Sequence, residues 1–321
     1  MLDDSSSRLA FVFPGQGSQS PGMLADYFEH SAIFRQCFEE ASEALGFDLW
    51  ALVASGDQHI LSLTANTQPV LLTASVAIYR VFENITPVRP GFLAGHSLGE
   101  FSALTAAHTF TLTDAVRLVR KRGELMQAAV PEGVGAMAAV IGLDDDSISN
   151  LCQEVSASAG GVVEAVNFNA PGQVVIAGIK EAVSAASEAL KQAGAKRVLP
   201  LPVSAPFHTS LMQPAAQALR VALERISLQM PTIPIIHNVT AAAASESNDI
   251  LNLLVTQLYS PVRWTQCVNA MAAAGVLTTV ECGPGKVLSG LTKRINSSLD
   301  SESLSTFDGL LRYTESLEVN L

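Results

Sequence analysis

The chain has 321 residues and a formal net charge of −11, because 30 Asp and Glu outnumber 19 Lys and Arg. This acidic balance argues against nucleic acid or an anionic membrane surface as the partner. No apolar run approaches the roughly 20 residues that cross a bilayer. Residues 1–8 are polar and lack the core of a signal peptide, so we expect a cytoplasmic protein.

The four cysteines are scattered along the chain and form no CxxC pair: Cys37, Cys152, Cys267 and Cys282. This spacing argues against a zinc site and against a disulfide framework. We therefore expect buried free thiols and no metal.

Four short apolar runs predict buried strands, with helical patterns between them. They are Leu9–Phe13, Phe92–Ala94, Ile233–Val239 and Val276–Cys282. This alternation of strands and helices favours a mostly parallel sheet. Turns that contain glycine follow several of the runs, at residues 14–17, 95–99 and 283–285. They would place polar groups at the carboxyl edge of the sheet, where open α/β sheets bind ligands.

Residues 95–99, GHSLG, match the G-x-S-x-G pattern of a nucleophile elbow centred on Ser97. A predicted strand precedes the pattern and a helical pattern follows it, as an elbow requires. The turn would lift the serine hydroxyl to a helix N-terminus, where free N–H groups favour a developing oxyanion. Five-residue matches also occur by chance in ordinary loops, but this context favours a catalytic serine.

Two backbone N–H groups are candidates for the oxyanion hole. The first belongs to Leu98, directly after the serine. The second belongs to Gln16, because Gly15 and Gly17 let the backbone approach a ligand. A phosphate-binding role for this loop is the alternative, although it has neither the P-loop nor the dinucleotide-binding spacing.

A predicted helix after Thr111 carries an apolar stripe, and Arg122 falls on that stripe. A buried arginine is rare unless it is paired, so Arg122 should meet an anion. Two partners remain open. One is a carboxylate of the protein, and the other is a carboxylate of the substrate held by the forked guanidinium.

Residues 131–203 predict a small subdomain of their own. Its expected elements are strand Ala136–Leu143, helix Asp146–Ser156, strands Val162–Phe168 and Val174–Ile179, helix Lys180–Ala193 and strand Arg197–Leu201. This βαββαβ order is typical of a ferredoxin-like unit. We expect it to be inserted into a larger α/β subdomain formed by residues 1–130 and 204–321, with a cleft between the two.

A serine hydroxyl needs a general base, and His208 and His237 are the candidates. His208 is favoured because it follows the serine in sequence and lies in a rigid, proline-bound loop, whereas His237 falls within a predicted strand. A structural histidine is the alternative reading of His208. No Asp or Glu stands out as the group that would orient it. The other four histidines have less suitable positions. We expect His30 and His59 to be solvated, His108 to end a helical turn and His96 to pack beside the serine.

The last stretch of the chain, after Ser297, is acidic and rich in serine. Such composition is typical of mobile tails, and we expect one here. The rest of the sequence contains no internal repeat or low-complexity tract.

Seven motifs, taken together, resemble the malonyl-CoA:acyl carrier protein transacylases. They are Phe13–Gln19, Gly95–Glu100, Arg122-Gly123, Asn167–Asn169 with Pro171–Gln173, Phe207-His208, Gln257–Tyr259 and Gly283–Lys286. They follow the order of that family and span most of the chain. Their joint specificity is far higher than that of any one motif.

The resemblance implies an α/β-hydrolase-like core with the inserted ferredoxin-like subdomain. It also implies that Ser97 is acylated, that His208 is its base and that Arg122 binds the malonyl carboxylate. The oxyanion hole would be the N–H groups of Gln16 and Leu98.

The resemblance assigns further residues as well. The main-chain carbonyl of Gln257 would orient His208, which accounts for the missing carboxylate. Phe207 resembles the bulky residue of malonyl-selective relatives. The candidates for contacting the coenzyme A or phosphopantetheine arm are Asn167, Asn169, Lys196 and Arg197.

The expected reaction is a ping-pong transfer of malonyl from malonyl-CoA to acyl carrier protein, by a monomer without a cofactor. A chain with no fused synthase module favours fatty acid over polyketide synthesis. An esterase or thioesterase and a non-catalytic acyl-binding scaffold are the alternatives. An acidic carrier protein would need a basic patch on the enzyme. The candidates for this patch are Arg117, Lys121, Lys191 and Lys286. The alternative is that each is an ordinary solvated charge.

Overall fold

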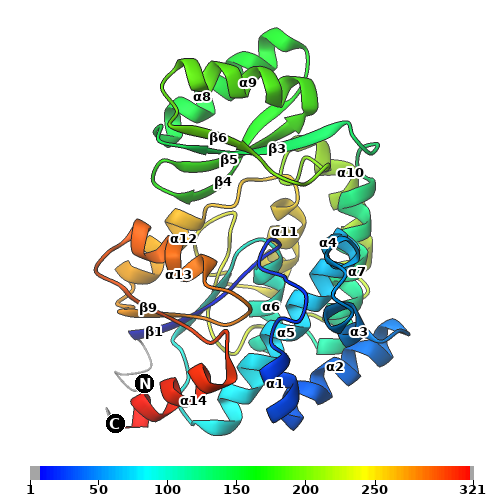
Figure 1. Cartoon of the computed structure of the whole chain (residues 1–321), viewed down its shortest axis with the longest axis vertical. Helices are drawn as coiled ribbons and strands as arrows, with labels where there is room; N and C mark the ends of the chain where they lie inside the picture. The colour runs from blue at the N-terminus through cyan, green and yellow to red at the C-terminus, as the bar shows by residue number, and fades with distance from the viewer. Residues whose placement is uncertain (1–7, 319–321) are drawn as a thin grey trace.

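The computed structural model describes residues 8–318, which form two sheets with helices around them (Figure 1). The polar start of the chain, residues 1–7, lies outside the described residues. Within the described range, no helix is long and apolar enough to cross a membrane. The four cysteines are buried and free, as predicted.

The larger sheet is parallel throughout, as the sequence predicts. Its strands are β1 (Leu9–Phe13), β2 (Phe92–Gly95), β7 (Ile235–Ile236), β8 (Thr278–Glu281) and β9 (Asp300–Ser303). Their spatial order is β7-β2-β1-β8-β9, so β1 is central. Every residue of β1 is buried.

Helices cover both faces of this sheet. They are α1 (Ala25–His30), α2 (Ala32–Leu45), α3 (Leu49–Ala54), α4 (Gln58–Ser62), α5 (Thr64–Ile85), α6 (Leu98–Ala106), α7 (Leu112–Ala128), α10 (Gln213–Leu223), α11 (Ser247–Gln257), α12 (Trp264–Ala273), α13 (Val287–Ile295) and α14 (Phe307–Glu318), with a short 3₁₀ turn at Ser210–Met212. Successive residues of β1 alternate between the two faces. Phe11 contacts Tyr79 and Phe82 of α5 on one face, whereas Val12 belongs to the apolar cluster of α12 on the other.

The smaller sheet is antiparallel, and Figure 1 shows α8 and α9 covering its outer face. Its elements are β3 (Gly135–Ile141), α8 (Asp145–Ala159), β4 (Val163–Ala170), β5 (Gln173–Ile179), α9 (Lys180–Gln192) and β6 (Arg197–Pro200). The strand order is β4-β5-β3-β6. The predicted βαββαβ order is therefore confirmed.

Strand β4 joins the smaller sheet to segments of the larger part of the molecule. The N–H of Phe168 donates to the carbonyl of Val262 (3.0 Å), and the N–H of Val262 donates to the carbonyl of Val166 (2.8 Å). Glu164 accepts hydrogen bonds from both the N–H and the hydroxyl of Ser210 (2.9 and 2.6 Å). Because these bonds tie β4 to the loop before α12 and to the 3₁₀ turn before α10, they hold the smaller sheet against the larger part of the molecule.

Two predictions about the second half of the chain were wrong. The strand expected at residues 233–239 is only two residues long, because a turn begins at His237, whose carbonyl accepts from the N–H of Ala241 (2.8 Å). The tail expected to be mobile includes β9 and α14 within its described residues, 298–318, whereas residues 319–321 lie outside the described range. Leu304 and Leu310 are fully buried, and the hydroxyl of Tyr27 donates to the carbonyl of Leu304 (2.7 Å). Its serine and acidic residues lie largely on the exposed side of these elements.

Gly99 offers a test of how α6 packs on β1. A Cβ at this position would overlap the carbonyl oxygen of Phe13, whereas a Cβ at Gly290 in α13 meets open space. We expect Gly99→Ala to lower the free energy of unfolding by about 3 kcal/mol. Gly290→Ala, the control, should raise it by about 0.5–1 kcal/mol because alanine favours helix. Urea unfolding of both variants measures this, and equal stabilities would contradict the packing.

Candidate active site

The turn between β2 and α6 places Ser97 at a positive φ, outside the regions that residues with side chains usually adopt (φ 52°, ψ −106°). Such a conformation is strained for a residue with a side chain and requires close support. The support comes from tight packing, since a Cβ at Gly95 would overlap the backbone of Gly99. The small residues of the GHSLG pattern therefore serve the turn geometry, as the sequence predicts.

The structure brings Ser97 and His208 together. The serine Oγ lies 2.8 Å from His208 Nε2, and His208 Nδ1 lies 2.7 Å from the carbonyl oxygen of Gln257. A carbonyl oxygen can only accept, so Nδ1 carries the proton and Nε2 is free to accept one from the serine. A backbone carbonyl thus orients His208, a role for which no Asp or Glu could be identified from the sequence.

His208 is buried, and its surroundings disfavour the imidazolium form. Burial lowers its pKa from 6.5 to about 3, and the nearby positive charge of Arg122 acts in the same direction. The imidazole is therefore neutral near pH 7. A neutral imidazole is the form that can take a proton from the serine hydroxyl.

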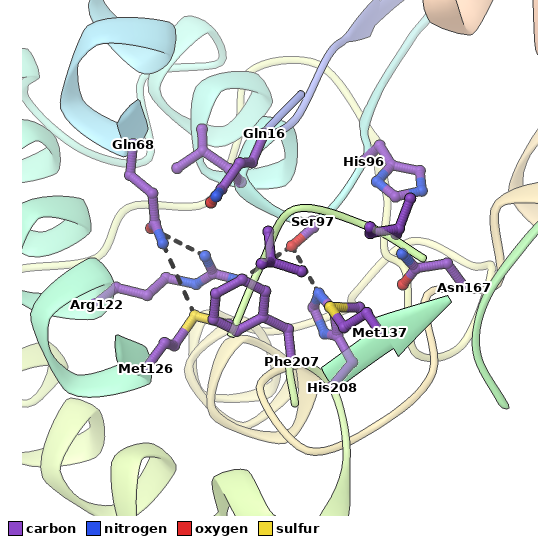
Figure 2. A pocket seen from close by; sticks show the side chains of 13 residues that line it. Gln16, Gln68, His96, Ser97, Arg122, Met126, Met137, Asn167, Phe207 and His208 are labelled. Atoms are coloured by element: carbon purple, nitrogen blue, oxygen red, sulfur yellow. Dashed lines mark hydrogen bonds between the residues drawn. The ribbon is translucent and has the colours of Figure 1, made fainter. Parts of the chain in front are cut away.

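Arg122 extends from α7 to the same place, and its side chain is almost fully buried. One terminal nitrogen donates to Gln68 Oε1 (2.9 Å), and the other donates to Gln257 Oε1 (2.9 Å) and to Ser97 Oγ (3.2 Å). Figure 2 shows Arg122 between Gln68 and the serine. The guanidinium also lies over the ring of Phe101, 5.1 Å from its centre.

The buried charge of Arg122 is not paired with a carboxylate of the described residues. Among residues 8–318, no carboxylate lies within 4.0 Å of its guanidinium, so the internal salt bridge is absent, and its Nε has no hydrogen-bond partner. Burial lowers its pKa to about 9, and Glu100 acts in the opposite direction. Neutral amide oxygens hold this cation, and its charge is not matched by an adjacent anion.

The side chain of Gln257 connects Arg122 to a buried carboxylate. While its Oε1 accepts from Arg122, its Nε2 donates to Glu100 Oε2 (3.0 Å) and to the carbonyl of Ser97 (3.1 Å). Glu100 also accepts from His237 Nδ1 (2.8 Å). His237, the other candidate base, therefore lies against a carboxylate and not against the serine.

Ser97, His208 and Arg122 border a pocket of about 120 Å³ between the two sheets (Figure 2). Met137 of β3 and Asn167 of β4 come from the smaller sheet. The remaining lining residues come from the larger part or from the segment that returns to it: Gln16, Gln68, His96, Ser97, Leu98, Arg122, Met126, Leu201, Val203, Phe207 and His208. Polar groups lie around the serine, and Phe207, Met126 and Met137 add apolar walls.

The two candidate oxyanion donors also border this pocket. The N–H groups of Gln16 and Leu98 have no acceptor among the described residues. Their loops lie against each other, because a Cβ at Gly15 would lie 2.5 Å from the carbonyl oxygen of His96. Both donors are thus available to a ligand beside the serine.

The other predicted contact residues have different settings. Asn167 lines the pocket, and its buried Oδ1 has no partner. Asn169 lies within hydrogen-bond distance of His96, Oδ1 to Nε2 2.7 Å. Lys196 and Arg197 are exposed at the start of edge strand β6, and neither lines the pocket.

Sequence reasoning missed Gln68, Asn238 and the side chain of Gln257. Gln68 is a polar residue inside the apolar pattern of α5, which is a recognisable signal of a buried hydrogen-bonding role. Asn238 follows a short apolar run and gave no comparable signal. Its amide bonds to the backbone on both sides of His96, at Gly95 and Ser97.

This fold and site define an acyl-transfer enzyme, with a hydroxyl, a neutral imidazole and unoccupied N–H donors around one pocket. An acyl transferase domain model matches residues 10–308. The chain is 56% identical over 299 residues to the malonyl CoA-acyl carrier protein transacylase of Escherichia coli K12, covering 93% of this chain and 96% of that protein. The corresponding Bacillus subtilis protein is 46% identical over 93% of this chain and 94% of its own length.

Solved structures agree with these relatives. An acyl carrier protein S-malonyltransferase from Vibrio cholerae superposes with a TM-score of 0.93 at 52% identity, covering 95% of this chain and 99% of that one. A malonyl-transacylase solved in complex with its type II polyketide acyl-carrier protein gives 0.94 at 50% identity, covering 96% and 99%. The chain belongs to the malonyl CoA-acyl carrier protein transacylase family, as its motifs predict.

The low pKa of His208 predicts how stability varies with pH. Between pH 6.5 and about 3 the unfolded chain binds a proton on this residue that the folded chain does not bind. The free energy of unfolding should therefore fall as pH decreases through this window. In His208→Gln that part of the decrease should be missing, whereas His59→Gln, at an exposed histidine, should keep it. Urea unfolding from pH 7 to 4 checks this, and identical pH profiles for all three proteins would contradict the shift.

Proposed function

We propose that this enzyme transfers the malonyl group of malonyl-CoA to the phosphopantetheine thiol of an acyl carrier protein, through a malonyl ester on Ser97, and so supplies fatty acid synthesis. The observation that carries the proposal is Arg122, a buried guanidinium that pairs with no carboxylate of residues 8–318 and lies 3.2 Å from the serine hydroxyl. A malonyl group has a carboxylate two bonds from its thioester carbonyl. The names of the relatives support the same donor and acceptor.

In the first half-reaction, Ser97 Oγ attacks the thioester carbonyl carbon while His208 Nε2 takes the hydroxyl proton. The carbonyl oxygen becomes an oxyanion, which the N–H groups of Gln16 and Leu98 are placed to stabilise. When the oxyanion collapses, the carbon–sulfur bond breaks. The coenzyme A thiolate leaves and takes the proton from His208, and the serine ester remains.

In the second half-reaction, the thiol of the carrier protein attacks the ester carbonyl. His208 takes the thiol proton and passes it to Ser97 Oγ as the carbon–oxygen bond breaks. The same base serves both directions because its Nδ1 proton stays bonded to the Gln257 carbonyl (2.7 Å). This bond keeps the tautomer and the ring orientation fixed.

Arg122 selects the acyl group through charge. A carboxylate that enters the pocket would pair with a guanidinium already ordered by Gln68 and Gln257, so little side-chain entropy is lost on binding. An uncharged acyl group would leave that cation without an anion. Phe207 narrows the same pocket and limits branched acyl groups.

The arm would extend from the pocket, and the carrier protein would bind outside it. Asn167 and Asn169 are proposed to contact the pantetheine, and Lys196 and Arg197 its phosphates. The same interpretation makes the enzyme a cytoplasmic monomer. It needs no cofactor, because the reaction involves no redox step and Ser97, His208 and the backbone donors supply each proton and charge. The candidates for docking an acidic carrier remain Arg117, Lys121, Lys191 and Lys286.

Replacing the nucleophile gives the first test. Incubation with malonyl-CoA should raise the intact mass of the protein by one malonyl group, and peptide mapping should locate it on Ser97. Ser97→Ala should show no adduct, because no other group provides the ester oxygen. Ser102→Ala, at a buried serine five residues further on in α6, is the control and should still be acylated. An adduct of undiminished occupancy in Ser97→Ala would refute the assignment.

The selectivity of Arg122 separates malonyl transfer from general esterase chemistry. Arg122→Ala should lower the rate of Ser97 acylation by malonyl-CoA by about 10²-fold or more, the cost of removing one partner of a buried charge pair. Acylation by acetyl-CoA should already be slow in the parent enzyme, and Arg122→Ala should lower its rate by a much smaller factor. Arg120→Ala, on the same helix but partly exposed, should leave both rates unchanged. Equal losses for the two donors would argue against a carboxylate-binding role.

A further inference from the structure

Asn238 lies two residues after the end of strand β7, and its side chain makes the hydrogen bonds to β2 that a longer β7 would make through its backbone. The β2–β7 ladder pairs Leu93 with Ile235 and Ala94 with Ile236. Continuing this register by two residues sets Asn238 opposite His96. In a parallel ladder, the residue opposite His96 donates its N–H to the carbonyl of residue 95 and accepts from the N–H of residue 97.

The backbone of Asn238 cannot make these bonds. Its N–H donates to Glu100 Oε2 (2.9 Å), and its carbonyl accepts from the N–H of Arg263 (3.1 Å). The side-chain amide makes them instead. Nδ2 donates to the carbonyl of Gly95 (2.7 Å), and Oδ1 accepts from the N–H of Ser97 (2.8 Å).

These two bonds act directly on the strained part of the site. Ser97 holds a positive φ, and the backbone groups on either side of His96 would otherwise be buried without partners. Asn238 is itself fully buried. Because its Oδ1 occupies the N–H of Ser97, the oxyanion must use the N–H of Leu98 and of a second loop.

We propose that Asn238 is a positioning residue for the nucleophile: its side-chain amide replaces a peptide unit of β7 and fixes the turn so that Ser97 Oγ faces His208. The inference rests on the proposed acylation of Ser97. Asn238 neither lines the substrate pocket nor contacts Arg122, and the bond that its Oδ1 accepts from Gln257 Nε2 is long, at 3.4 Å. It should therefore affect the rate of acylation and not the binding of the acyl donor.

The test compares the parent enzyme with Asn238→Ala, Asn238→Asp and Val268→Ala. Val268→Ala is the control, because Val268 is buried in the apolar cluster behind the turn and makes no bond to it. Asn238→Asp keeps the side-chain volume and the acceptor for the Ser97 N–H, but it loses the donor to Gly95. Two rates are measured for each protein: single-turnover acylation by malonyl-CoA and phosphonylation of Ser97 by a small neutral fluorophosphonate.

Asn238→Ala should lower both rates by about 10²-fold, the cost of a misplaced reacting atom. The malonyl-CoA concentration at half-maximal rate should stay within about twofold, because uniform binding is intact. Asn238→Asp should give intermediate rates, and Val268→Ala should lose thermal stability while keeping the parental rates. If Asn238→Ala does not fold, Asn238→Asp is compared with the control in the same way.

Parental rates in the Asn238 variants, or a loss of donor binding without a loss of rate, would overturn the inference. A parent enzyme that reacts with the fluorophosphonate at Ser97 but not with malonyl-CoA would instead refute the proposed function. In that case the phosphonylation rates still test Asn238, so the two failures are distinguishable.

Discussion

The sharp turn at Ser97 is the constraint on which the rest of the site depends. A positive φ at a serine persists only where the surroundings hold it, and here the backbones of β1, β2 and α6 approach so closely that Gly95 and Gly99 leave no room for a Cβ. The same turn exposes the N–H of Leu98 and brings the Gln16 loop against His96. One backbone feature therefore sets the nucleophile and both candidate oxyanion donors at once.

In the function that we propose, Arg122 gives this general arrangement its preference for an acyl group that carries an acid. Burying a guanidinium costs free energy unless an anion or several oxygens compensate. The compensation here comes from two neutral amides, while the negative charge of Glu100 is kept one amide away, beyond Gln257. The cation is ordered, partly balanced and still able to pair with an incoming carboxylate. A salt bridge with a protein carboxylate would have ordered it equally well but would have blocked the carboxylate of the proposed substrate.

The sequence predicts those features that depend on local patterns. Apolar runs and helix periodicity indicate both sheets, and the spacing of GHSLG indicates the turn because small residues are needed at fixed places. Arg122 is found because a charge on an apolar stripe needs a partner. In contrast, Gln68 and Asn238 act through contacts with residues far along the chain, and a short β7 depends on a turn at His237. The prediction of a mobile tail was wrong because it relied on the serine and acidic content, whereas the buried leucines, Leu304 and Leu310, hold the tail against the core.

The central claim is that one pocket holds the serine ester and its terminal carboxylate together. A crystal structure of the enzyme acylated with malonyl-CoA tests this most directly. We expect electron density for a malonyl ester on Ser97, with the carboxylate paired to the guanidinium of Arg122 and the ester carbonyl oxygen between the N–H groups of Gln16 and Leu98. A malonyl group whose carboxylate points to solvent, with Arg122 still bonded only to its glutamines, would contradict the account.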